Sequence, residues 1–205
     1  MMAARDEEFE LKRQQIIAGA LKVFSAKGFE KATNQEIAAA AGIGSPGLIY
    51  HYFDSKADLL HQAVASRSPL LQSVIHDDAL HGLQPRDALR LVGSALLNTL
   101  NDPGILQLFR VMVGEAMRDP AVAEAWRVSG PRPALGALGR YLKSQMEAGT
   151  LRTMDPWLAA SCFLGQIIFY LMSMEVFRQQ ESVGGGKDAL LDVAVEIFLT
   201  GMEAQ

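Results

Sequence analysis

The stretch from Thr33 to Lys56, TNQEIAAAAGIGSPGLIYHYFDSK, constrains the fold more than any other part of the chain. It predicts two short helices joined by a tight turn, followed by the start of a third helix. Thr33 and Glu36 are three residues apart, which is the spacing of a capping box at the start of a helix. Gly42 is expected to end this helix, because glycine readily adopts the left-handed conformation after a helical C-terminus.

The second helix of this stretch begins with Ser45 and Pro46, a hydroxyl N-cap followed by a proline at the first helical position. Ile49 and Phe53 are four residues apart and therefore share one face. The outward face carries small, aromatic and imidazole side chains, whereas a merely solvated helix would carry Glu, Lys and Ala. Two short helices with a glycine-containing turn are typical of a helix-turn-helix, and this outward face favours DNA binding over an ordinary helical hairpin.

The charge distribution supports this interpretation, although the whole chain has a formal net charge of −4. Residues 11–56 hold six basic and three acidic side chains, whereas residues 1–10 and residues 57–205 are both net acidic. The basic region therefore coincides with the predicted motif. Because its excess charge is small, helix N-termini and hydroxyl donors are expected to share the contacts to phosphate.

Residues 11–60 resemble the N-terminal domain of the TetR family of bacterial transcriptional regulators. The matching features are the leading amphipathic helix that ends AKGFEKAT, the IAAAAGI segment, PGLIYHYF and the DSKADLL that follows. The turn GIGS is one residue longer than the family's commonest form. The resemblance implies an N-terminal arm and DNA-binding domain over residues 1–56, and a C-terminal ligand-binding and dimerisation domain over residues 57–205.

Base-reading side chains are expected on the outward face of the second short helix. Tyr50 and His51 can donate hydrogen bonds, and Leu48 can contact a thymine methyl group. Contacts to phosphate are expected from hydroxyl and ammonium groups at matching family positions. The alternatives are half-buried packing for Tyr50 and Tyr52, and a plain solvated lysine for Lys56. The predicted DNA-binding residues are Thr33, Ser45, Pro46, Gly47, Leu48, Tyr50, His51, Tyr52 and Lys56.

The rest of the chain has helical periodicity without the alternation of strands, so the predicted fold class is all-α. A three-helix head is expected to continue through a long helix, capped by Ser55, into a C-terminal helical bundle. The first helix is expected over residues 8–27, after a flexible N-terminal arm. The later helices are expected over residues 85–100, 103–118, 120–128, 133–148, 156–179 and 188–202. Acidic–proline pairs mark three of these starts: Asp102–Pro103, Asp119–Pro120 and Asp155–Pro156.

The predicted helix over residues 156–179 is unusually apolar. The nineteen uncharged residues between Asp155 and Glu175 are long enough to cross a membrane. Proline, serine, glycine and glutamine interrupt them and no strong Lys/Arg cluster flanks them, so no membrane partner is expected. A helix that is apolar on all sides must be covered on all sides. The last two helices are therefore expected to pair with those of a second copy in a four-helix homodimer interface. The family resemblance implies the same dimer, with heads reaching two half-sites roughly 35 Å apart.

A small, largely apolar ligand is expected between helices of the C-terminal bundle, because bundle cores host ligands in this way. Methionine side chains adapt to irregular apolar ligands. Glu115, in the otherwise apolar run RVMVGEAM, would anchor a ligand amine or pair with Arg110, Arg118 or a neighbouring helix. The alternative for each candidate is plain core packing. The candidates are Phe109, Met112, Glu115, Met117, Trp126, Phe163, Tyr170 and Met174.

Catalytic and metal-binding interpretations find little support in the sequence. The single cysteine, Cys162, lies in an apolar run where cysteine is usually inert, and it excludes an intrachain disulfide. The group His76, Asp77, Asp78 and His81 has poor ligand geometry, because its histidines are five residues apart and face different sides of a helix. No phosphate-binding loop, hydrolase elbow or paired-cysteine motif is present. We therefore expect no enzyme activity, no cofactor and no metal.

The sequence predicts a homodimeric transcriptional regulator, in its favoured form a repressor. It would bind a two-fold symmetric operator in double-stranded DNA and leave it when a small apolar ligand binds. Ligand binding would shift the fourth helix and change the separation of the two heads. In the alternative, the C-terminal domain of the same DNA-binding dimer binds a protein partner. The charged N-terminus lacks the apolar core of a secretory signal, so a cytoplasmic location is expected.

Overall fold

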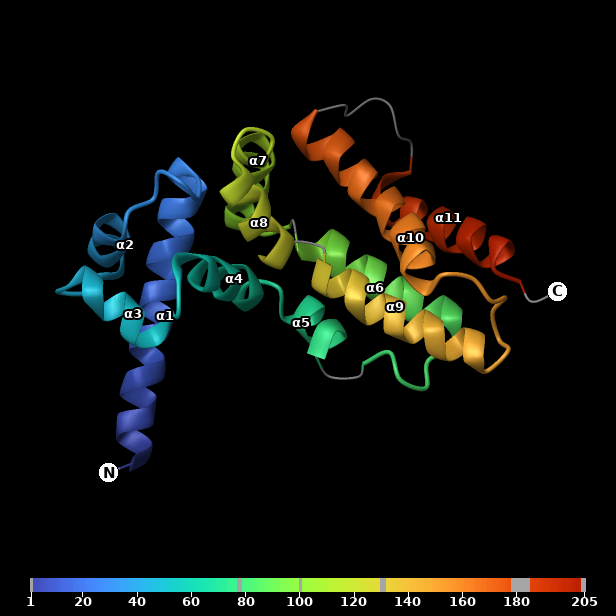
Figure 1. The fold of residues 1–205 in the computed structure, drawn as a ribbon, viewed down its shortest axis with the longest axis horizontal. Helices are drawn as coiled ribbons and strands as arrows, with labels where there is room; N and C mark the ends of the chain where they lie inside the picture. Colours follow the sequence, from blue (N-terminus) through green and yellow to red (C-terminus); the bar gives the residue numbers. More distant parts are fainter. Residues whose placement is uncertain (1, 77–78, 100, 130–131, 178–184, 204–205) are drawn as a thin grey trace. The chain divides into compact units, whose positions relative to one another are not determined.

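The computed structural model describes residues 2–76, 79–99, 101–129, 132–177 and 185–203 (Figure 1). The regular elements in this part of the chain are helices, and none of its residues forms a strand, which confirms the predicted all-α class. Packing divides the chain into two compact units. The first, the head unit, comprises Met1–Arg67 and Asp102–Gly130, and the second, the bundle unit, comprises Ser68–Asn101 and Pro131–Gln205. The functional boundary expected after residue 56 stays a prediction.

The head unit is built on α1 (Met2–Lys27), against which α2 (Asn34–Ala41), α4 (Lys56–Ser66) and α7 (Pro103–Ala116) pack (Figure 1). One face of α1 supplies the centre of the apolar core. Its fully buried side chains are Ile16, Ala20 and Phe24. The fully buried side chains that the other helices of this unit contribute include Ile37, Ile49, Leu59, Leu60 and Met112.

Three shorter elements complete the helical part of the head unit. A 3-10 turn (Pro46–Leu48) leads directly into α3 (Ile49–Tyr52). The remaining helix, α8 (Pro120–Ser129), packs against α4 and α7.

The first helix is longer than the sequence analysis predicted. It begins at Met2, where a flexible arm was expected, because the Ala, Arg, Glu and Leu residues of this segment are good helix formers and no helix breaker interrupts them. The fourth helix is shorter than predicted and ends at Ser66. Pro69 disfavours a helical conformation for the residue before it, so the chain breaks before starting the next helix.

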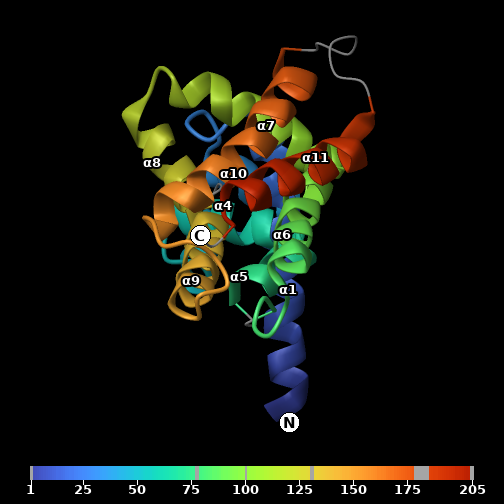
Figure 2. The same ribbon diagram turned by 90° about the vertical axis from the view of Figure 1, so that its right-hand side faces the viewer.

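The bundle unit contains α5 (Pro69–His76), α6 (Pro85–Thr99), α9 (Arg132–Glu147), α10 (Pro156–Leu171) and α11 (Gly186–Gly201). The most apolar helix, α10, packs against α6, α9 and α11 (Figure 2). It continues as a π-helical turn over Met172–Val176. Fully buried side chains from these helices include Leu89, Val92, Leu138, Leu142, Phe163, Ile167 and Val195.

The acidic–proline pairs mark helix starts as predicted. Asp102 accepts hydrogen bonds from the backbone N–H groups of Gly104 and Ile105 at 2.8 and 3.1 Å, at the start of α7. Asp155 accepts corresponding bonds at the start of α10, from the two residues that follow Pro156, both at 2.8 Å. These side chains satisfy N–H groups that have no partner within the helix.

The segment Pro156–Val176 is apolar and long enough to cross a membrane by length and composition, with a mean hydropathy of 1.6. Within the most apolar stretch of 18 residues in this segment, 44% is buried inside the protein. The core helix of a soluble protein has the same length and composition, so this property alone does not indicate a membrane protein.

A first prediction concerns the close approach of α1 and α2. A Cβ atom on Gly19 would lie 2.7 Å from the backbone nitrogen of Ala41, so the helix backbone itself would have to move. We expect Gly19→Ala to lower the free energy of unfolding by about 1–3 kcal/mol in urea denaturation. The control is Gly114→Ala in α7, where the added Cβ meets no atom within 4 Å. It should raise that free energy by about 0.5–1 kcal/mol. Equal effects of the two substitutions would contradict this account.

Candidate nucleic-acid interface

The first helix of the predicted motif, α2, is fixed at both ends as the sequence predicts. The Glu36 N–H donates to Thr33 Oγ1 at 3.2 Å, and the Thr33 N–H donates to Glu36 Oε2 at 3.1 Å, which confirms the capping box. Gly42 ends the helix with φ +67°. Lys27 also pairs with Glu36, and this hydrogen bond, followed by those from Thr33, holds the pKa of Glu36 below its ordinary value.

The second helix of the motif starts as the predicted cap but in a tighter form. Ser45 Oγ accepts a hydrogen bond from the Gly47 N–H at 3.3 Å, and Pro46 opens a 3-10 turn in place of an α-helical turn. Ile49 and Phe53 are both buried, as their spacing predicts. They anchor the inner face of a short element whose outer face stays open to solvent.

The outer face of this element gathers most of the predicted base-reading residues. Tyr50 is 58% exposed, so it does not pack half-buried, and its hydroxyl accepts a hydrogen bond from the Asn34 side-chain amide at 2.7 Å. The exposed residues of this surface are Ser45, Pro46, Gly47, Tyr50 and His51, and Leu48 is half-buried. We call this set, together with Asn34, the reading surface.

Two residues that contact this region, Asn34 and Phe9, were not predicted. Asn34 directly follows the cap residue Thr33 and donates to Tyr50. The signal in the sequence that could have indicated this contact is a polar side chain at the start of a helix. Phe9 lies in the acidic N-terminal part of α1, and its ring centroid lies 4.5 Å from that of Tyr52 and 6.1 Å from that of His51. Sequence periodicity does not identify this partner, because the contact joins two helices far apart in the chain.

Lys56 lies within the head unit and is half-buried. Its ammonium donates to the Glu30 carbonyl at 3.1 Å and lies 4.6 Å from the centroid of the Phe29 ring. Burial lowers the pKa of Lys56, and the carboxylates of Glu30 and Glu115 act in the opposite direction. To contact a DNA phosphate, the Lys56 ammonium would therefore have to donate a second hydrogen bond beside the one to the Glu30 carbonyl, or give up that bond.

The predicted ligand residues are divided between the two units. Phe109, Met112, Glu115 and Met117 belong to the head unit, where the first two are buried and Met117 is 86% exposed. The members in the bundle unit are Phe163, Tyr170 and Met174. The remaining candidate, Trp126, lies in α8, but its side chain is outside the described residues. A shared pocket for this set stays a prediction.

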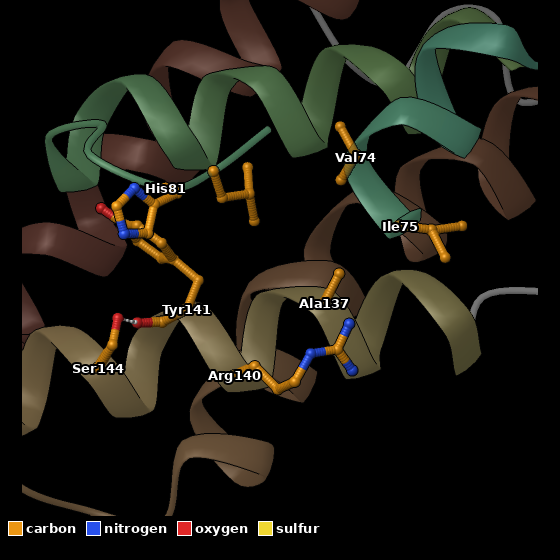
Figure 3. A pocket seen from close by; sticks show the side chains of 8 residues that line it. Val74, Ile75, His81, Ala137, Arg140, Tyr141 and Ser144 are labelled. Carbon is orange, nitrogen blue, oxygen red and sulfur yellow. Dashed lines mark hydrogen bonds between the residues drawn. The ribbon is translucent and has the colours of Figure 1, made fainter. Parts of the chain in front are cut away.

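The bundle unit has a cavity of about 200 Å³ between α5, α9 and the segment before α6 (Figure 3). Figure 3 shows His81 and Tyr141 at one end of it and Arg140 and Ile75 at the other. The Tyr141 hydroxyl donates to the Leu83 carbonyl at 2.8 Å, and burial, followed by the charge of Asp87, raises the pKa of Tyr141 to about 12. The described lining of this cavity includes no member of the predicted ligand set.

The described residues include no group of three or more His, Cys, Asp and Glu side chains that could hold a metal ion.

The reading surface offers hydroxyl, imidazole and amide groups on a capped two-helix motif. Such groups can recognise base edges and phosphates.

Comparison with known protein families identifies the class. Residues 16–63 match the family model described as bacterial regulatory proteins, tetR family. Residues 87–201 match the model described as AefR-like transcriptional repressor, C-terminal domain. The chain therefore belongs to the TetR family of DNA-binding transcriptional regulators, which are not enzymes.

Individual relatives agree with this assignment. The HTH-type transcriptional regulator SrpR of Pseudomonas putida is 27% identical over 144 residues, which span 70% of this chain and 65% of SrpR. A TetR-family regulator from Mesorhizobium loti MAFF303099 has a similar solved structure, with a TM-score of 0.69 and 27% identity over 95% of this chain and 98% of that one. The solved structure of the flavonoid-responsive regulator FrrA is also similar, with a TM-score of 0.67 and 26% identity over 95% of this chain and 98% of FrrA.

A second prediction concerns the capping box. Replacing Thr33 with alanine removes the acceptor for the Glu36 N–H. We expect Thr33→Ala to lower the free energy of unfolding by about 1 kcal/mol. Ser161→Ala is a suitable control, because its exposed hydroxyl donates to the Trp157 carbonyl within α10 and caps no helix. Thermal denaturation of both variants checks this, and a loss as large in the control would contradict the proposed role of the cap.

Proposed function

We propose that this protein is a homodimeric repressor that binds a two-fold symmetric operator and is released by a small, largely apolar ligand. The observation that carries the proposal is the reading surface, which is held outward by a buried pair, Ile49 and Phe53, and by a capped α2. Membership of a family of transcriptional regulators supports a cytoplasmic site of action.

The reading surface has the chemistry needed for the major groove. Tyr50 already accepts a hydrogen bond from Asn34, so its own proton remains available for a base or a phosphate. His51 is exposed beside it, and Leu48 adds an apolar contact. Gly47 and Pro46 let the backbone approach the groove without a bulky side chain. Thr33, Tyr52 and Lys56 are proposed as phosphate contacts at the edges of this surface.

The last two helices carry the proposed dimer interface. Leu158 and Phe169 on α10 are 68% and 72% exposed, and Val193 and Ile197 on α11 are 56% and 61% exposed. Large apolar side chains that are exposed on two neighbouring helices favour an interaction surface, because their exposure to water is unfavourable. A second copy of the same two helices would cover them in a four-helix arrangement.

The proposed ligand is small and largely apolar. The predicted set is dominated by aromatic and methionine side chains, which suit an irregular apolar molecule. The similar structure of FrrA, a regulator described as flavonoid-responsive, supports a ligand of this kind. Ligand would have to bind the DNA-free arrangement more tightly than the DNA-bound one, because only such a difference shifts the equilibrium.

A third prediction tests operator binding. Selection of bound sequences from random duplex DNA should recover a two-fold symmetric site, and fluorescence anisotropy on it should show an affinity that falls steeply with salt. Tyr50→Phe should weaken binding about three- to tenfold, since it removes one hydrogen bond. Lys143→Ala, on the exposed side of α9, is the control and should leave the affinity unchanged. Failure to enrich any symmetric sequence would contradict the proposal.

A fourth prediction tests the dimer. Ile197→Glu places a charge on the proposed interface and should convert the dimer to a monomer in sedimentation velocity. Leu11→Glu is matched to it, because Leu11 is 62% exposed but lies on α1 in the head unit. That variant should remain dimeric. A monomeric wild-type protein at micromolar concentration, or dissociation by both variants alike, would contradict the proposed interface.

A further inference from the structure

The end of α7 makes a polar contact to the turn between α1 and α2. The carboxylate of Glu115 accepts a hydrogen bond from the Phe29 backbone N–H, 3.0 Å from nitrogen to Oε2. Gly28 ends α1 with φ +82°, and a Cβ atom there would lie 2.2 Å from Glu115 Oε1. The carboxylate therefore lies directly against the backbone of this turn, in space that only glycine leaves free.

The turn that Glu115 holds is connected to the DNA-binding motif. The Phe29 ring packs on Phe24 in the core of the head unit, with 5.8 Å between ring centroids. The ammonium of Lys56, the first residue of α4, lies 4.6 Å from the centroid of the Phe29 ring and is also bonded to the Glu30 carbonyl. Three residues after Glu30 the chain reaches Thr33, the cap of α2. The Glu115 carboxylate thus contacts the turn that leads into α2, and Phe29 and Glu30 of this turn also contact Lys56 at the start of α4.

The other end of α7 is attached to the same unit. The Ser25 hydroxyl donates to the Gly104 carbonyl at 3.0 Å, and Arg67 pairs with Asp102, the cap of α7, at 3.2 Å. A shallow surface depression borders this first turn of α7, lined in part by Lys22, Ser25 and Gln107. Hydrogen bonds and an ion pair therefore attach both ends of α7 to the rest of the head unit.

We propose that Glu115 is a positioning residue that couples α7 to the DNA-binding motif. A displacement of α7 is carried by the Glu115–Phe29 hydrogen bond to the turn at residues 28–31, and from there to the start of α2. The same α7 carries Phe109 and Met112 of the proposed ligand set. Assigning this coupling to operator release rests on the proposed function. In this role Glu115 connects α7 to the DNA-binding motif and does not anchor a ligand.

Peptide-resolved hydrogen exchange of the full-length protein tests the coupling without DNA. In Glu115→Ala, exchange over residues 28–41 should rise about tenfold, because the Phe29 N–H loses its acceptor and the turn is released. Glu115→Gln keeps an acceptor oxygen and should stay within about threefold of wild type. Glu147→Ala, on the exposed side of α9, is the control and should match wild type.

Operator affinity gives the second measurement. Glu115→Ala should weaken binding to the selected duplex about five- to tenfold, with an unchanged dependence on salt because no phosphate contact is lost. Unchanged exchange over residues 28–41, or a uniform rise over every peptide of the protein, would overturn the proposal. Equal operator affinity of Glu115→Ala and Glu147→Ala would overturn it as well. If wild type binds no duplex, the proposed function fails, while the exchange comparison still decides whether Glu115 holds the start of α2.

Discussion

The packing of α1 is the constraint on which the head unit depends. This helix supplies the buried centre and receives α2, α4 and α7 on its surface. The approach of α2 is close enough that Gly19 faces the backbone of Ala41. Because α2 is fixed in this way, the short element over residues 46–52 that follows it has a defined position. The packing of the core therefore also determines where the reading surface lies.

The proposed function would let a head unit of modest positive charge bind DNA through the reading surface. In the proposed function, the side chains of Asn34, Tyr50 and His51 supply directional contacts to DNA through amide, hydroxyl and imidazole groups. The half-buried Lys56 contacts Phe29 and Glu30 within the head unit. The charge of Lys56 thus helps to hold the motif together, and the proposed recognition relies more on directional contacts than on charge.

Local signals made the fold and much of the motif predictable. The caps at Thr33, Asp102 and Asp155 depend on residues two or three positions away, so the sequence alone could place them. Contacts between distant segments were not predictable, because no periodicity encodes them. The hydrogen bond from Phe29 to Glu115 joins residues 86 positions apart, and the contact of Phe9 with Tyr52 joins two helices. The length of α1 was missed because its acidic start resembles a solvated arm.

A crystal structure of the protein bound to its selected operator tests the central claim most directly, namely that the element over residues 45–51 reads DNA while α7 stays attached to the head unit. The account predicts Tyr50 and His51 against base edges or phosphates of the major groove, with the Phe29 N–H still bonded to Glu115. A complex in which residues 45–51 face away from the duplex would contradict the assignment of the reading surface. A complex in which Glu115 has left Phe29 while the operator stays bound would contradict the coupling through α7.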